Sequence, residues 1–141
     1  MPPVTPAELA ARIDQTLLAP TATPAQVQSL CEGARKHRFR AVCVSPSYVP
    51  LVVRHLEGSG VRVCTVVGFP LGSSTPAAKA YEAEEAVHAG ATDIDMVINL
   101  GRLKVGHLDY VRDEISAVIR AAACVAEGIV IKVIIEACHL T

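Results

Sequence analysis

The chain has 141 residues, 51% of them hydrophobic and 19% charged, which suits one globular domain and excludes a disordered segment. The formal net charge of −1, with a single basic cluster at residues 35–40, argues against nucleic acid or an acidic membrane as a partner. No apolar run is long enough to span a bilayer and no signal-peptide pattern opens the chain, so we expect a cytoplasmic protein.

Helix start signals alternate with short β-branched runs in the first half of the chain. Thr5-Pro6-Ala7-Glu8 is a capping box with proline at the first helical position, and Thr23-Pro24 repeats this start signal. A short strand is predicted at residues 15–18 and a buried strand at residues 40–45. The apolar spacing that follows predicts a helix over residues 46–56.

The second half continues the same alternation. Strands are predicted at residues 61–67, 93–98 and 129–135, and helices at residues 75–90 and 108–122. Strands separated by crossover helices must be parallel, so the chain is predicted to be an α/β protein. Because no linker interrupts the series, we predict a single domain over residues 1–141. Two architectures fit, an open doubly wound sheet and part of a (β/α)-barrel.

Side-chain alternation places one charge on a face of each of the last two strands. Asp95 points away from the apolar face of Ile94 and Met96. Lys132 points away from the apolar face that Ile131, Val133 and Ile135 share. These apolar faces are expected to pack on helices. An unpaired buried charge costs several kcal/mol, so we expect the two charged groups to meet. The spacing fits a purely structural ion pair and a catalytic pair equally well.

Other polar residues carry weaker signals. Asp14 and Thr16 flank the first predicted strand, where helix capping is the simpler interpretation. Three lysines, Lys36, Lys79 and Lys104, are predicted on helices or loops, where solvent would cover them. The five cysteines form no C-x-x-C pair or Cys/His cluster, so no metal site is predicted. No Ser/His/Asp arrangement can be assembled from the five histidines.

Five segments resemble, in the same order, the first five strands of the deoxyribose-phosphate aldolases. They are Ile13-Asp-Gln-Thr-Leu-Leu-Ala-Pro-Thr-Ala-Thr23, Ala41-Val-Cys-Val-Ser-Pro-Ser-Tyr-Val49, Val66-Val-Gly-Phe-Pro-Leu-Gly72, Asp93-Ile-Asp-Met-Val-Ile-Asn99 and Lys132-Val-Ile-Ile-Glu136. The resemblance covers essentially the whole chain. Five consecutive matches are far more specific than any one of them.

The resemblance implies a (β/α)8 TIM barrel, present here as an incomplete barrel of about five parallel strands without the last three. It also implies a class I aldolase, an aldehyde-lyase that needs no metal or other cofactor. Such enzymes cleave 2-deoxy-D-ribose 5-phosphate to D-glyceraldehyde 3-phosphate and acetaldehyde, in deoxyribonucleotide and carbohydrate catabolism. A lysine amine forms an imine with the substrate carbonyl, and this Schiff base accepts electrons as the carbon–carbon bond breaks.

Position by position, Asp95 matches the family's proton-relay aspartate, and Lys132 matches a supporting active-site lysine. Asp14, Thr16 and Cys43 match residues that line the substrate end of the barrel. The family's imine-forming lysine lies on the sixth strand, in a Lys-Thr-Ser-Thr-Gly type of motif, and a second lysine that lowers its pKa lies on the seventh. Both positions lie beyond the 141 residues of this sequence.

The expected partner is therefore a small phosphorylated sugar, with no nucleic acid and no membrane. We expect this chain to be inactive by itself, and to associate with further copies through its open sheet edges. Two other interpretations stay open. One is a non-catalytic barrel fragment that acts only by pairing with another chain, and the other is a different class I aldolase of similar fold.

Overall fold

The computed structural model describes residues 3–140 of the chain. Contacts group the chain into two compact units, one ending at Thr65 and the other beginning at Val66. The five strands, β1 to β5, form a parallel sheet in chain order. No helix in the described residues is long and apolar enough to cross a membrane. That the 141 residues make one domain stays a prediction.

The first unit contains α1 (Pro6–Ala10), α2 (Pro24–His37), a 3-10 turn, η1 (Pro46–Tyr48), and α3 (Val49–Leu56). Of these, α1 and α2 begin at the predicted threonine–proline signals. At α1, the amide of Glu8 donates to Thr5 Oγ1 at 3.2 Å, and the amide of Thr5 donates to Glu8 Oε2 at 2.8 Å. This reciprocal capping box uses backbone donors that a helix start would otherwise leave unpaired. Thr23 and Gln26 form the same arrangement at α2.

The strands of the first unit are short, and the first of them is less buried than the other two. They are β1 (Asp14–Leu17), β2 (Ala41–Val44) and β3 (Arg62–Val67), the last of which runs on into the second unit. In the register of these strands, Thr16 pairs with Cys43, and Cys43 pairs with Cys64. All four residues of β2 are buried, because β2 lies between two strands and α2 packs on it.

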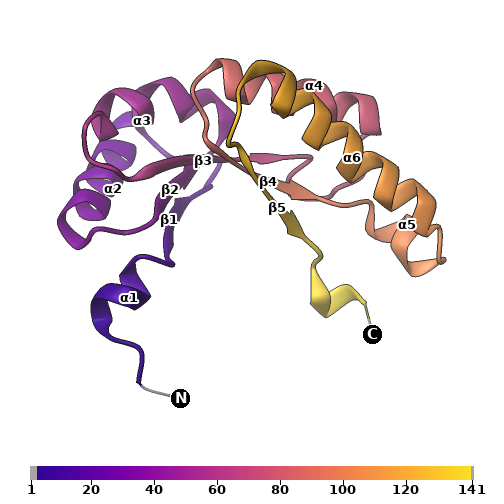
Figure 1. Cartoon of the computed structure of the whole chain (residues 1–141), viewed down its shortest axis with the longest axis horizontal. Helices are drawn as coiled ribbons and strands as arrows, with labels where there is room; N and C mark the ends of the chain where they lie inside the picture. The colour runs from indigo at the N-terminus through magenta and orange to yellow at the C-terminus, as the bar shows by residue number, and fades with distance from the viewer. Residues whose placement is uncertain (1–2, 141) are drawn as a thin grey trace. The chain divides into compact units, whose positions relative to one another are not determined.

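The second unit holds the strands that carry the predicted ion pair. Its elements are α4 (Pro76–His88), β4 (Asp93–Val97), α5 (Leu100–Lys104), α6 (Leu108–Val125), β5 (Val130–Ile134) and a final 3-10 turn, η2 (Ala137–His139). Helices α4 and α6 lie side by side (Figure 1). The sequence did not predict α5, because a five-residue helix is too short to show an apolar period.

The apolar face of β5 differs from the prediction. Val133 and Ile135 were expected to pack on helices, but their exposed fractions are 38% and 48%. The corresponding face of β4 does pack as predicted, since Ile94 and Met96 are fully buried. The difference arises because β5 is the last strand in the sheet order, and nothing in residues 3–140 covers these two side chains.

Candidate active site

Asp95 and Lys132 meet across neighbouring strands, as the sequence predicted. They are direct register partners in β4 and β5, and Lys132 Nζ lies 2.7 Å from Asp95 Oδ1. The contact is a close ion pair. Both side chains keep some exposure, 20% for Asp95 and 33% for Lys132, so a small molecule could reach them.

Sequence reasoning missed a third charged group at this place. Lys132 Nζ lies 3.8 Å from Oδ2 of Asp93, whose side chain is completely buried. Asp93 stands two residues before Asp95 in β4 and therefore points to the same face of the strand. The alternation that singled out Asp95 could have identified it. One ammonium group thus faces two carboxylates, a crowding of like charge that is typical of functional sites and also occurs in structural networks.

Asp14, Thr16 and Cys43 lie in the first unit, on β1 and β2. The helix-capping interpretation of Asp14 and Thr16 is wrong, because both residues lie within β1. Both carboxylate oxygens of Asp14 accept from Nη1 of Arg40, at 3.1 and 3.3 Å. The hydroxyl of Thr16 donates to the carbonyl oxygen of Asp14 at 2.9 Å, and Thr16 is exposed. Its register partner Cys43 is 2% exposed.

The lysines outside the strands divide into two kinds. Lys36 and Lys104 are exposed, as predicted. The prediction for Lys79 is wrong, because its side chain is completely buried and its Nζ lies 2.7 Å from Oε2 of Glu114, which is also fully buried. Lys79 shares one face of α4 with the buried residues Ala83 and Val87, so the helix directs it into the protein.

One group of possible metal ligands occurs near the end of the described residues. Ligand atoms of Glu136, Cys138 and His139 all lie within 4.8 Å of one another. These residues are close in sequence, and Cys138 and His139 are exposed. Exposed groups of this kind are common without an ion, and we give them no metal-binding role.

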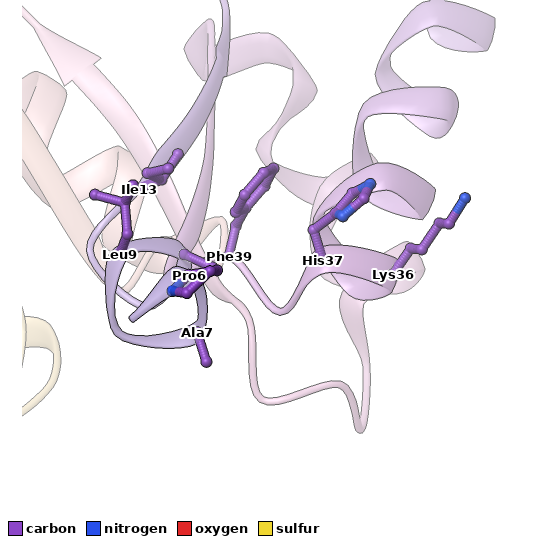
Figure 2. A pocket seen from close by; sticks show the side chains of 8 residues that line it. Pro6, Ala7, Leu9, Ile13, Lys36, His37 and Phe39 are labelled. Carbon is purple, nitrogen blue, oxygen red and sulfur yellow. The ribbon is translucent and has the colours of Figure 1, made fainter. Parts of the chain in front are cut away.

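The first unit also carries an open pocket of about 410 Å³ beside α1. Figure 2 shows its lining, which includes Leu9, Ile13 and Phe39, with Lys36 directed away from the other labelled side chains. Ile13 precedes β1, so this pocket lies at the amino end of that strand. Ligands of parallel sheets bind at the carboxyl ends of the strands. The pocket is therefore not a candidate for the active site.

No family model matches the chain. Curated relatives match almost all of it. The chain is 47% identical over 138 residues to a deoxyribose-phosphate aldolase of Carboxydothermus hydrogenoformans, covering 98% of this chain and 60% of the relative. It is 50% identical over 129 residues to the deoxyribose-phosphate aldolase of Streptococcus gordonii, covering 92% of this chain and 57% of the relative.

Solved structures agree with these relatives. A protein from Coccidioides immitis, described as a proposed deoxyribose-phosphate aldolase, superposes with a TM-score of 0.93 at 36% identity, covering 100% of this chain and 54% of that one. A deoxyribose phosphate aldolase from Aeropyrum pernix, described as tetrameric, gives a TM-score of 0.83 at 38% identity. That match covers 94% of this chain and 54% of the other.

The chain spans about 60% of the length of these curated relatives and about half of the solved chains. The five-stranded parallel sheet and these structural matches confirm the predicted fold, an incomplete (β/α)-barrel. The predicted resemblance is also confirmed, since the match extends over nearly every residue. Over essentially its whole length, the chain is thus a relative of the deoxyribose-phosphate aldolases and corresponds to a part of their barrel.

Proposed function

We propose that the protein to which this chain belongs is an aldehyde-lyase that cleaves 2-deoxy-D-ribose 5-phosphate reversibly to D-glyceraldehyde 3-phosphate and acetaldehyde. The observation that carries this proposal is the identity of 47% over 98% of the chain to a deoxyribose-phosphate aldolase. The partly exposed ion pair of Asp95 and Lys132, on adjacent strands, supports it.

In this proposal Asp95 is the proton relay. A general acid–base group must be able to reach the reacting carbon, directly or through one water. The 20% exposure of the Asp95 side chain is compatible with this, whereas Asp93 is fully enclosed. Lys132 supports the relay by supplying a positive charge next to two carboxylates, which would otherwise repel each other on one face of β4.

The proposal places Asp14, Thr16 and Cys43 among the substrate-binding residues. The hydroxyl of Thr16 is exposed and could donate to or accept from a sugar hydroxyl. Asp14 is held by Arg40, so its carboxylate has a fixed orientation. We place the imine-forming lysine outside these 141 residues, on a sixth strand that the resemblance implies.

The test is an assay of the complete protein with deoxyribose 5-phosphate, following the release of acetaldehyde. Treatment with borohydride in the presence of substrate should trap the imine and identify its lysine by mass spectrometry. Turnover that depends on an added divalent metal, or the absence of any trapped lysine, would contradict a class I mechanism. Turnover with other aldehydes and none with deoxyribose 5-phosphate would favour a different class I aldolase.

We further propose that the protein assembles with copies of itself, in the cytoplasm, and serves deoxyribonucleotide catabolism. The relative from Aeropyrum pernix is described as tetrameric. A second candidate function is that of a non-catalytic barrel fragment that acts only by pairing with another chain, which the exposure of Val133 on β5 and of Ile135 directly after it favours. Stable association with a separate polypeptide that carries the missing strands, without turnover of deoxyribose 5-phosphate, would support that alternative.

A further inference from the structure

The second unit contains a completely buried ion pair that the proposed reaction does not use. Lys79 of α4 and Glu114 of α6 are both 0% exposed, and Lys79 Nζ lies 2.7 Å from Glu114 Oε2. Removing two charges from water costs several kcal/mol for each ion, and their attraction often only offsets this cost. A buried ion pair is therefore weak evidence for stabilisation. Its role depends on the other groups that each ion binds.

The ammonium group of Lys79 holds the loop that follows β3. Its Nζ donates to the carbonyl oxygen of Gly72 at 2.8 Å. This loop, residues 68–72, is also closed within itself, because the amide of Gly72 donates to the carbonyl oxygen of Gly68 at 2.7 Å. The amide of Gly68 donates to Oε2 of Glu82, on α4, at 2.8 Å. The loop after β3 is thus attached to α4 at both of its ends.

The carboxylate of Glu114 holds the backbone that follows β4. Its Oε1 accepts the amide of Asn99 at 2.6 Å, while Oε2 binds Lys79. Asn99 in turn caps α5, since its Oδ1 accepts the amide of Arg102 at 3.0 Å. The two oxygens of one carboxylate therefore join the end of β4 to Lys79, and through Lys79 to Gly72.

The two held segments also touch each other directly. Gly72 has a φ of +66°, and a Cβ at this position would collide with the carbonyl oxygen of Ile98 and would come within 2.9 Å of Val97 Cγ1. Gly68 has a φ of +64°, and a Cβ there would lie 2.9 Å from Lys79 Cε. Both glycines are therefore required by backbone conformation and by close approach. The contacts form one connected arrangement of loop 68–72, residues 98–99 and the ion pair.

We propose that Lys79 and Glu114 are positioning residues, which fix the end of β4 and so hold Asp95 in place for the proposed relay. Asn99 follows β4 directly after Ile98 and lies four residues after Asp95. Its anchored amide prevents the end of β4 from fraying. The inference rests on the proposed function for what Asp95 does. The anchoring itself is independent of any activity. The loops after β3 and β4 lie at the carboxyl ends of the strands, where barrel enzymes place their sites.

The first test uses the 141-residue chain and needs no turnover. In the double variant Lys79→Met with Glu114→Leu, apolar side chains of similar length replace the ion pair, so no unpaired buried charge is left. Global stability should fall only by the contribution of the two backbone groups that lose their partners, the Gly72 carbonyl and the Asn99 amide. The amide of Asn99 loses its acceptor, and its hydrogen exchange, followed by mass spectrometry of peptides across residues 97–103, should become at least about tenfold faster. Exchange in β2, which is remote from the pair in sequence, should stay unchanged.

A conservative variant and a matched control complete this test. Lys79→Met with Glu114→Gln keeps an oxygen that can accept the Asn99 amide and leaves no buried ammonium to compete for it, so this variant should retain most of the protection that the Met/Leu double variant loses. The control is Arg112→Gln on the same helix α6, where Arg112 binds Asp109 at 2.7 Å on the exposed surface. It should leave exchange at residues 97–103 unchanged. Equal protection in the double variant and the parent, or an equal loss in the control, would overturn the anchoring.

The second test concerns Asp95 and uses the complete protein. If the pair positions the relay, the double variant should lose up to about 10²-fold in kcat, the order expected when a remote change displaces a reacting group. KM should change much less, and Lys79→Met with Glu114→Gln should recover part of kcat. Faster exchange at residues 97–103 with unchanged kcat would overturn the positioning role and leave the proposed function intact. Failure of the parent protein to turn over deoxyribose 5-phosphate would instead overturn the proposed function alone.

Discussion

Lys132 Nζ lies 2.7 Å from Asp95 Oδ1 because the two residues are direct register partners in adjacent parallel strands. The same ammonium group lies 3.8 Å from Oδ2 of the fully buried Asp93. One cation therefore serves two carboxylates on the same face of β4. Replacing any of these three side chains by a neutral one changes the net charge on this face.

Replacement of Asp95 by Asn should remove most of the turnover of the complete protein. The amide has nearly the same shape but cannot accept and return a proton, and a general acid–base role is typically worth about 10²–10⁴-fold. Imine trapping by borohydride should stay near the parent level, since the relay acts after the lysine has attacked. Near-normal kcat in this variant would indicate that the ion pair of Asp95 has a purely structural role.

Replacement of Lys132 by Leu should reduce turnover less than Asp95→Asn but should destabilise the fold. It leaves Asp93 and Asp95 without this ammonium group, and an unsatisfied buried acceptor costs about 1–3 kcal/mol. The partial exposure of Lys132 places the expected loss toward the lower end of this range. The matched control is Lys104→Leu, at an exposed position. Urea unfolding that gave equal midpoints for both variants would contradict the prediction.

The 141-residue chain by itself should form no specific imine. A lysine must be neutral and accessible to attack a carbonyl. Lys36 and Lys104 are exposed and in contact with water, and Lys79 is enclosed by Glu114 and the carbonyl of Gly72. Incubation with acetaldehyde and borohydride should therefore give only trace labelling. A stoichiometric adduct on Lys132, with measurable cleavage of deoxyribose 5-phosphate, would show that the catalytic lysine has moved.

The isolated chain should also associate through β5. This strand ends the sheet order; Val133 on it is 38% exposed, and Ile135 directly after it is 48% exposed. Open edges and exposed apolar side chains drive association. Sedimentation should show species larger than a monomer, and Val133→Lys should reduce their share more than Val105→Lys, an exposed position outside any strand. A compact monomer for the parent chain would disprove this expectation.

Cys31 should be protected from alkylation. Burial raises the pKa of its thiol above the ordinary value of 9.0, and Arg35 opposes this effect to a smaller degree. The folded chain therefore keeps this proton to higher pH than the unfolded chain. The resulting stability is fully present below about pH 9 and is lost as the pH rises through the raised value. Iodoacetamide should modify the exposed Cys124 well before Cys31, and Cys31→Ala should flatten the alkaline loss of stability.

Much of the secondary structure was determined by short local patterns. The capping boxes at Thr5 and Thr23 set the starts of α1 and α2, because their hydrogen bonds join residues only three apart. The face of β4 that carries Asp95 also followed from the sequence, because side chains alternate along any strand. The partnership of Asp95 with Lys132 was predictable once the strands were assumed to be neighbours, since neither charge is easily buried alone.

The tertiary structure decided the rest. The sequence placed Lys79 and Glu114 on two helices but gave no sign that they meet, since 35 residues separate them and only packing of α4 against α6 brings them together. A charged residue within the apolar stripe of each helix was a local sign that each side chain is buried, but it did not indicate that the two meet. The attachment of Gly72 and Asn99 to this pair likewise depends on contacts between elements. Local patterns fix how each element forms, whereas packing fixes which charges share an environment with little water.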